Sequence, residues 1–580
     1  MKNCLMLRSL PLFLSCSATF LLTYPNSTFS ANQTNPPTQE DATLARELLH
    51  LKNKQQFDEV DKNFKKANKF LAPSKENHQQ QIKPTDNTIS TRKITSVSVD
   101  IGSEKVTLDF SRVINDYQGK ALSTQVVFQL VKDLTDVLYR AGYVTSAIGL
   151  KNHKIQNGDL QFVVLWGRVS DVLVEGKVPE KLKDKAMISV LPPLKDKLLN
   201  IYDIDQLVEI LNTTNKNAKV NVVAADTQGS SHLNIERKRT YFPEVGFGLN
   251  NSGTESNANG RNQATLNISL SDVLGTNDQW HFSTGYRLYK QNKANQQQNY
   301  ALSYSQPFSF STLDVKLSQS QYEKAVKGVN GTYASSGKTQ TLGLKLTNVL
   351  SRNQNSILSA YGELEFKKRV SYFADIQTGN YRNNKANIGL SYVTNFAQGK
   401  LYADISYTNG LRWFGANYSA YDDKREKTLK LLSGSVNWQR LISLFKRSMN
   451  YQLRVGGQYG FDSLYSENQF SIGDEYTVRG FKGGAASGDS GVYLSQTITV
   501  PFYPQKPYLS QISLLAGLDV GQVYVRKTHK SDTLAGIALG VKAQVKSLSL
   551  SFTYGQPLKG ANDVENNRQP VYYFNGSISF

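Results

Sequence analysis

The sequence predicts a mainly β protein, with a transmembrane antiparallel β-barrel of roughly sixteen strands behind two small α/β modules and an N-terminal helix. Residues 241–580 alternate apolar and polar side chains, without a convincing helix. The last strand ends in an aromatic residue, and the first thirty residues look like an export signal. A mean hydropathy of −0.43 excludes a bundle of membrane helices, which would need several apolar runs of about 20 residues.

The composition narrows the class of protein further. The 580 residues carry a formal charge of +20, but Lys and Arg are spread along the whole length, which is typical of a solvated surface and does not favour nucleic-acid binding. The only cysteines are Cys4 and Cys16, so a disulfide scaffold is excluded.

Residues 1–30 have the pattern of a secretory signal peptide. Lys2 and Arg8 precede an uncharged apolar stretch over residues 9–24, and small residues follow before Ala31. We expect cleavage near Ala31, which leaves an exported chain without cysteine, as suits an oxidising compartment.

Residues 31–91 combine one helix with a linker. The sequence predicts a helix over residues 38–71 that is polar on most faces, followed by a flexible segment over residues 72–87. Such a helix is solvated, packed in a polar cavity, or not stably formed. Its thin apolar stripe contains Leu44, Leu48 and Leu51.

Two α/β modules are predicted over residues 92–167 and 168–238. The first has a helix over residues 122–143, whose apolar residues recur at three- and four-residue steps. The second has a helix over residues 203–213, for which Asp203 and Gln206 form a capping pair. Strands are expected over residues 94–99, 143–150, 159–166, 169–174, 219–224 and 231–237.

The barrel is predicted over residues 239–580. At about 10 residues per strand and about 10 per turn or loop, residues 241–580 provide roughly sixteen strands, an even number as such barrels require. A soluble sandwich would also alternate, but the second face of Ser, Thr, Asn and Gly fits lipid outside and water inside. Closure is needed because no unpaired strand edge can face hydrocarbon. The C-terminal Phe580 resembles the assembly signal of outer-membrane barrels.

Several motifs resemble one transporter family. Residues 131–146, the Asn157–Leu160 turn and Gly167-Arg168-Val169 resemble a polypeptide-transport-associated (POTRA) module. Residues 474–481 resemble the tip of the sixth extracellular loop of that family, and residues 518–523 resemble its next barrel strand. The chain as a whole is similar to the outer-membrane transporters of two-partner secretion, the TpsB proteins.

The resemblance implies a contact inside the barrel. The long loop over about residues 465–490 would fold back into the lumen, where Arg479 would pair with Asp519 on the wall. The alternation of strand residues independently predicts that Asp519 faces the lumen, because its neighbours on both sides are of the lipid-facing type. A bidentate Arg–carboxylate contact is directional, and Arg keeps its positive charge when it is buried. The loop motif is Val478, Arg479, Gly480 and Phe481.

The resemblance also implies a function. The chain would be an outer-membrane pore with a periplasmic N-terminal part, which exports a large exoprotein unfolded and without nucleotide hydrolysis, the cargo being a haemolysin, a filamentous haemagglutinin or a contact-dependent inhibition toxin. The POTRA modules would receive the cargo, and the N-terminal helix would plug the resting pore. Further partners would be outer-membrane lipid, lipopolysaccharide and the barrel-assembly machinery, with the barrel itself monomeric. The alternatives are a barrel-assembly insertase and a passive porin.

Other motifs are set aside. Residues 488–491 match the serine-protease tetrad Gly-Asp-Ser-Gly, but no His has a visible place beside them. Gly337-Lys338-Thr339 is misspaced for a phosphate-binding loop, and the six histidines are scattered without metal-ligand spacing. We therefore expect no catalytic residue, no metal and no cofactor, and hence no enzyme.

Overall fold

The computed structural model describes residues 39–70, 92–151, 158–212, 216–239, 243–253, 261–289, 295–328, 331–416, 429–444, 447–560 and 569–580. The predicted signal peptide (1–30) and the whole predicted linker (72–87) lie outside these residues. The first described element is helix α2 (Gln39–Phe70). Among the described residues, no helix is long and apolar enough to cross a membrane.

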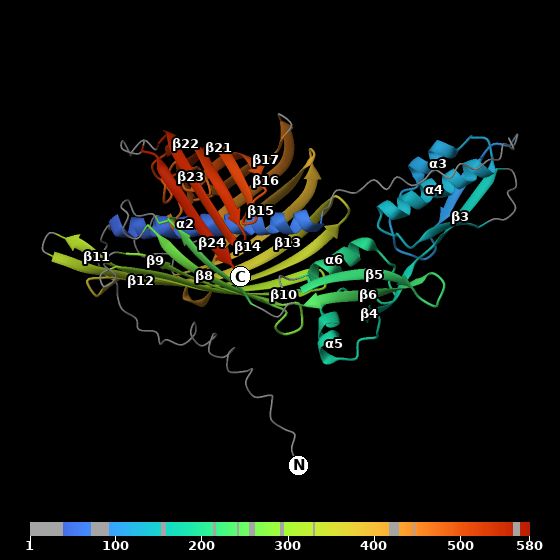
Figure 1. Cartoon of the computed structure of the whole chain (residues 1–580), viewed down its shortest axis with the longest axis horizontal. Helices are drawn as coiled ribbons and strands as arrows, with labels where there is room; N and C mark the ends of the chain where they lie inside the picture. The colour runs from blue at the N-terminus through green and yellow to red at the C-terminus, as the bar shows by residue number, and fades with distance from the viewer. Residues whose placement is uncertain are drawn as a thin grey trace, which may run out of the picture. The chain divides into compact units, whose positions relative to one another are not determined.

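The first α/β unit is a three-stranded sheet with two helices. Strands β1 (Ser96–Asp100), β3 (Asp159–Leu165) and β2 (Ala147–Leu150) lie in the order β1-β3-β2, and helices α3 (Ser111–Tyr117) and α4 (Thr124–Arg140) pack beside them (Figure 1). The α4 helix begins after Ser123, whose side chain accepts a hydrogen bond from the Val126 N–H. Its core face consists of Leu130, Leu134 and Leu138, all 0 % exposed.

The second α/β unit repeats this construction. Strands β4 (Arg168–Val174), β6 (Ser230–Arg239) and β5 (Lys216–Ala224) lie in the order β4-β6-β5, with helices α5 (Leu182–Ser189) and α6 (Ile201–Leu211). In both units the central strand pairs in parallel with one neighbour and antiparallel with the other.

Two details of the α/β units differ from the predictions. The α6 helix begins after Asn200, whose side chain accepts from the Tyr202 N–H, so the predicted capping pair of Asp203 and Gln206 is wrong. The physical reason is that Asp203 and Gln206 already lie within the helix, and Asn is as good a cap as Asp. Helices α3 and α5 were not predicted, because both are too short to show a clear period.

Sixteen strands form one closed antiparallel barrel, which confirms the predicted fold class. The first strand, β7, pairs with the last, β24, and so closes the sheet. The strands are β7 (Glu244–Asn250), β8 (Gln263–Ser271), β9 (Gln279–Arg287), β10 (Gln296–Phe308), β11 (Ser311–Gly328), β12 (Gly331–Arg352), β13 (Ser356–Phe373), β14 (Ile376–Phe396), β15 (Gly399–Leu411), β16 (Lys430–Leu444), β17 (Arg447–Gly460), β20 (Ser490–Phe502), β21 (Leu509–Val525), β22 (Lys530–Val545), β23 (Leu548–Lys559) and β24 (Val571–Ser579).

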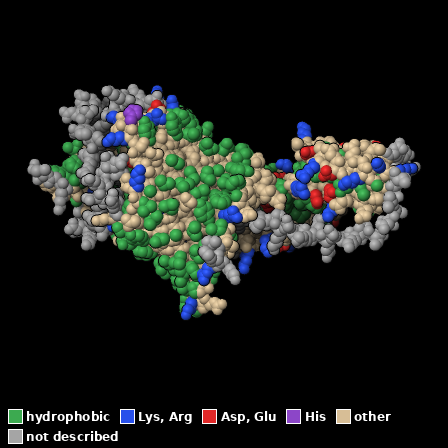
Figure 2. Space-filling view, turned by 90° about the horizontal axis from the view of Figure 1, so that it is seen from above, with side chains coloured by type: hydrophobic (Ala, Val, Ile, Leu, Met, Phe, Trp, Pro, Cys, Tyr) green, Lys and Arg blue, Asp and Glu red, His purple; other side chains and the backbone are tan. Residues whose placement is uncertain are grey.

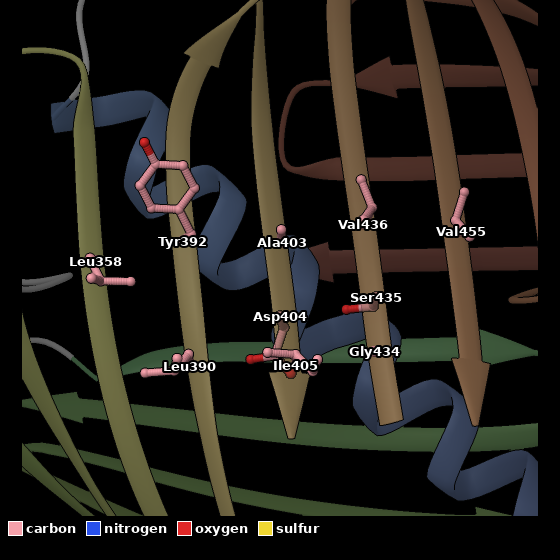
Figure 3. A pocket seen from close by; sticks show the side chains of 10 residues that line it. All are labelled: Leu358, Leu390, Tyr392, Ala403, Asp404, Ile405, Gly434, Ser435, Val436 and Val455. Carbon is pink, nitrogen blue, oxygen red and sulfur yellow. The ribbon is translucent and has the colours of Figure 1, made fainter. Parts of the chain in front are cut away.

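The outer wall of the barrel is apolar. Many outward side chains are large, hydrophobic and exposed, among them Leu350 at 55 % and Ile388 at 63 %, and hydrophobic side chains cover much of the barrel face in Figure 2. A shallow groove of about 390 Å³ lies in this wall, where the small residues Ala403 and Gly434 lie between larger ones. Figure 3 shows the side chains that line this groove. A lipid-facing wall of uneven side chains produces such a groove by itself.

Candidate functional site in the barrel lumen

The connection between β17 and β20 is folded and buried. It contains one short 3-10 turn, η2 (Ser466–Asn468), and a small antiparallel sheet of β18 (Phe470–Ile472) with β19 (Ala486–Gly488). We call residues 461–489 the lumen loop. Its apolar side chains form a cluster with the inner wall, in which Val478 is 0 % and Phe481 is 1 % exposed. The wall residues of this cluster are Val523 and Leu534.

Arg479 and Asp519 form a bidentate ion pair. Arg479 Nε donates to Asp519 Oδ2 at 2.6 Å, and Nη2 donates to Oδ1 at 2.7 Å. The Arg479 backbone N–H also donates to Oδ2 at 2.9 Å, and Nη2 donates to Thr497 Oγ1 at 2.9 Å. The Asp519 side chain is fully buried, and a buried carboxylate is costly unless it is paired. The positive charge of Arg479 compensates the negative charge of Asp519.

Glycines on the wall make room for this contact. A Cβ atom on Gly517 would lie 2.1 Å from Arg479 Nη2, and one on Gly536 would lie 2.0 Å from the Arg479 carbonyl oxygen. Gly480 itself has a φ of 108°, which a residue with a side chain rarely adopts. The tight turn and the close approach to β21 and β22 therefore both depend on the absence of side chains.

Tyr573 holds the turn from the other side. Its hydroxyl accepts from the backbone N–H groups of Gly480 (2.9 Å) and Phe481 (3.1 Å) and donates to the Phe481 carbonyl (2.5 Å). Tyr573 lies near the start of β24, and at the opposite end of that strand Phe580 pairs with Val245 through two backbone hydrogen bonds. The sequence prediction missed Tyr573, because aromatic residues occupy both faces of this strand.

Helix α2 contacts the lumen loop through polar side chains. Asp474 Oδ2 accepts from Asn53 Nδ2 at 2.9 Å, and His50 Nδ1 lies 3.3 Å from the same oxygen. Asn53 also donates to the Ser471 carbonyl at 3.1 Å. Burial lowers the pKa of His50, but the carboxylates of Glu475 and Asp474 outweigh it and raise that pKa above its usual 6.5.

The opposite Asp474 oxygen serves the loop alone. Oδ1 accepts from the backbone N–H groups of Tyr476 (3.0 Å) and Thr477 (2.9 Å), and from the Thr477 hydroxyl (2.8 Å). Asp474 therefore divides its two oxygens between the fold of the loop and the contact with α2.

Further along, α2 contacts the barrel wall. The Arg454 guanidinium lies 3.8 Å from the ring centre of Phe57, and Asn63 donates to the Tyr402 hydroxyl at 3.4 Å. Phe64 is 3 % exposed and packs with Val393 and Tyr402. Of the predicted apolar stripe, Leu51 is half-buried, whereas the side chains of Leu44 and Leu48 lie outside the described residues.

The motifs set aside from the sequence have structural roles. Ser490 Oγ accepts from the Gly460 N–H, and Asp489 accepts from the backbone N–H groups of Leu464 and Arg526. Lys338 lies within strand β12, not in a phosphate-binding loop. Within the described part of the chain, no group of His, Cys, Asp and Glu side chains could hold a metal ion.

Comparisons with known proteins agree with this architecture. Residues 229–543 match the family described as "Haemolysin secretion/activation protein ShlB/FhaC/HecB", and residues 93–167 match the ShlB-type POTRA domain. The chain is 26% identical over 487 residues to the outer membrane transporter CdiB of Escherichia coli, covering 83% of this chain and 81% of that protein. It is 26% identical over 437 residues to the hemolysin transporter protein ShlB of Serratia marcescens, covering 73% and 74%.

The fold itself matches a solved structure. The structure of CdiB from Escherichia coli superposes with a TM-score of 0.81 at 24% identity, covering 95% of this chain and all of that one. Together with the family match over most of the barrel, these observations place the protein: the chain belongs to the ShlB/FhaC/HecB family of haemolysin secretion/activation proteins, outer-membrane transporters built from POTRA units and a β-barrel.

Proposed function

We propose that this chain is the outer-membrane pore of a two-partner secretion system and exports one large exoprotein, of haemolysin, haemagglutinin or toxin type, to the cell surface. The observation that carries the proposal is the combination of a POTRA unit with a closed barrel whose lumen contains a helix and a folded loop. A passive porin has no use for α/β units, and a lumen filled in this way is not open at rest.

The α/β units would receive the exoprotein in the periplasm. Each unit ends in an edge strand, β2 in the first and β5 in the second, that pairs on one side only. An unpaired edge can capture an extended chain by main-chain hydrogen bonds, which suits an unfolded cargo. Folding of the emerged cargo outside would bias its movement, so no nucleotide is needed and no catalytic residue is proposed.

Helix α2 would be the plug, released when cargo arrives. Its polar contacts are made to the lumen loop, through Asn53 and His50, and to the barrel wall, through Asn63, and water can replace each of them. Its buried apolar side chains are few, Leu49 and Phe64 among them. We therefore expect a helix that is held specifically but can be released at modest cost.

Two experiments test the proposal. Deleting residues 39–70 should raise the conductance of the purified protein in planar bilayers while secretion of the co-expressed exoprotein largely survives; unchanged conductance would refute the plug. Deleting residues 92–238 should abolish secretion while the barrel still inserts in the outer membrane. Secretion by that variant would refute the role of the α/β units.

A further inference from the structure

A cavity lies at one end of the barrel, where strands β16, β17 and β20 meet their turns. Its volume is about 740 Å³, which is within the range of ligand sites. We call it the entry cavity. The residues that the argument uses from its lining are Leu441, Ser448, Asn450, Pro501 and Tyr503.

The entry cavity lies on the lumen side of the wall. Side chains of like parity share one face of a strand, and Asn450 has the parity of Arg454, which contacts α2 in the lumen. Leu441 stands directly opposite Asn450 on the neighbouring strand. Pro501 likewise has the parity of Thr497, which accepts a hydrogen bond from the lumen loop. A molecule in the cavity is therefore in contact with the inside of the pore.

The cavity is at the end of the barrel that meets the α/β units. The second unit contacts the turn after β10, where the Ser309 N–H donates to the Val190 carbonyl at 2.7 Å, and the end of β12, where Arg352 donates to Gln206 at 2.9 Å. Each antiparallel hairpin returns the chain to the same end, so the β16–β17 and β20–β21 turns lie there too. With the α/β units in the periplasm, the entry cavity is at the periplasmic mouth.

The entry cavity is accessible while α2 occupies the lumen. Leu441 is 74 % and Tyr503 is 71 % exposed with the helix in place. The described part of α2 packs on other strands at this end, where Phe64 contacts Val393 on β14 and Tyr402 on β15. Large apolar side chains that share a cavity open to water indicate a binding surface. A chain that arrives from the periplasm therefore meets this cavity before the helix leaves.

Asn450 offers hydrogen bonds that the described part of the chain does not use. Its Oδ1 is buried, and no described residue donates to it. The residue as a whole is only partly buried and lines the cavity, so a turn of its amide group presents either the oxygen or the NH₂ group to a bound molecule. A carboxamide has the donor and the acceptor that complement a peptide group, whatever the side chains of the peptide.

The remaining lining favours an uncharged segment of chain. Arg447 is the one charged residue among the described residues that line the cavity, and its guanidinium lies 4.8 Å from the ring centre of Phe502. Apolar contact and one main-chain hydrogen bond depend little on salt. The chemistry thus fits an extended polypeptide with apolar side chains.

We propose that the entry cavity is the first place on the barrel that holds the exported exoprotein, as an extended and uncharged segment, before α2 is released. Leu441 and Tyr503 receive an apolar side chain of that segment, and the Asn450 amide bonds its main chain, which makes recognition tolerant of sequence. This inference rests on the proposed function and adds to it a contact on the barrel itself.

The test uses the purified full chain in phospholipid nanodiscs, with p-benzoylphenylalanine in place of Tyr503 as a photocrosslinker. The probe is a fluorescent peptide of roughly twelve residues that alternates Val and Thr, about 40 Å long when extended. We expect it to crosslink, and a Gly/Ser peptide of the same length to crosslink far less. Leu441→Asn and Asn450→Leu should each weaken peptide binding about fivefold, since each removes one contact and keeps the side-chain size.

Matched controls define the site. Tyr508 is 65 % exposed in the same β20–β21 turn and does not line the cavity, so p-benzoylphenylalanine in place of Tyr508 should not capture the peptide. Leu441→Ile should retain binding. Equal crosslinking from both positions, or an unchanged affinity in the Leu441→Asn/Asn450→Leu variant, would overturn the site.

Two further outcomes also count against the proposal. Capture of phospholipid instead of peptide at position 503 would mean that the cavity opens to the bilayer. Capture of peptide only after deletion of residues 39–70 would mean that the cavity is closed at rest. Secretion by the full chain is measured separately: a chain that exports its exoprotein but does not bind the peptide removes the entry cavity alone, whereas a chain that exports nothing removes the proposed function.

Discussion

The contact between Arg479 and Asp519 should hold the lumen loop in place, and its strength can be worked out from the structure. Arg479→Ala removes two side-chain hydrogen bonds to Asp519 and leaves a fully buried carboxylate with only one backbone N–H donor. Removing one partner of a buried ion pair costs about 3–5 kcal/mol. We therefore expect the undocked loop to become roughly 150- to 5,000-fold more populated.

A buried cysteine reports the undocked state. Val478 is 0 % exposed and adjoins Arg479, and the only natural cysteines, Cys4 and Cys16, lie in the predicted signal peptide. In a Val478→Cys background, the thiol should react with a maleimide only when the loop leaves the wall. The labelling rate should rise by about a hundredfold or more with Arg479→Ala, and secretion of the exoprotein should fall.

A double-mutant cycle gives the decisive result. Asp519→Ala should cost as much as Arg479→Ala, and the double variant should cost about the same as either, because the second substitution removes a charge that is already unpaired. Thr497→Val is the matched control, since it removes one hydrogen bond to Arg479 and should cost about 1 kcal/mol. If the two losses of docking free energy add in the double variant, or if Arg479→Ala leaves the labelling rate unchanged, the ion pair does not anchor the lumen loop.

Other predictions follow from the same contacts. Tyr573→Phe removes a hydroxyl with three hydrogen bonds to the loop turn and should raise Val478→Cys labelling by about tenfold, whereas an unaltered rate would mean that the turn holds itself. Asn53→Ala should raise the frequency of channel openings in planar bilayers, because it removes two buried hydrogen bonds. Glu59→Gln should change it little, because Glu59, which pairs with Lys345, is 52% exposed. The pKa of His50 is raised in the docked helix, so its contribution to docking is fully present below 6.5 and is lost as the pH rises through the docked pKa. Channel openings should therefore be more frequent at pH 8.5 than at pH 6, and His50→Gln should flatten the difference; the opposite trend would exclude His50 as the source.

The barrel could be predicted because the alternation of apolar and polar residues along each strand shows which side chains face lipid and which face the lumen. The alternation placed Asp519 toward the lumen without any knowledge of its partner, and the structure has it fully buried there. Strand length was not predictable in the same way. Strands β12 and β14, of 22 and 21 residues, run far beyond the bilayer, and the alternation alone does not mark where the membrane ends.

The contacts of α2 were harder to predict for a physical reason. A helix packed against an apolar core shows a broad apolar stripe. Helix α2 lies against a polar lumen instead, so polar residues such as His50 and Asn53 make its contacts. The buried Leu49 and Phe64 do not belong to the predicted stripe of Leu44, Leu48 and Leu51. Asp474 pairs with residues more than 400 positions away, which no local pattern encodes.

The division of Asp474 between helix and loop has a consequence for the order of opening. When α2 leaves, Oδ2 loses His50 and Asn53 and meets water, but Oδ1 keeps its three bonds within the loop. The hydrogen bonds of the Arg479–Asp519 pair within the described residues are made to the loop and the barrel wall and not to α2, so the pair stays intact. The helix can therefore leave a lumen in which the loop is still docked, and deletion of residues 39–70 should open the pore only in part. Adding Arg479→Ala to that deletion should raise the conductance further, because it removes the second and separately anchored obstruction.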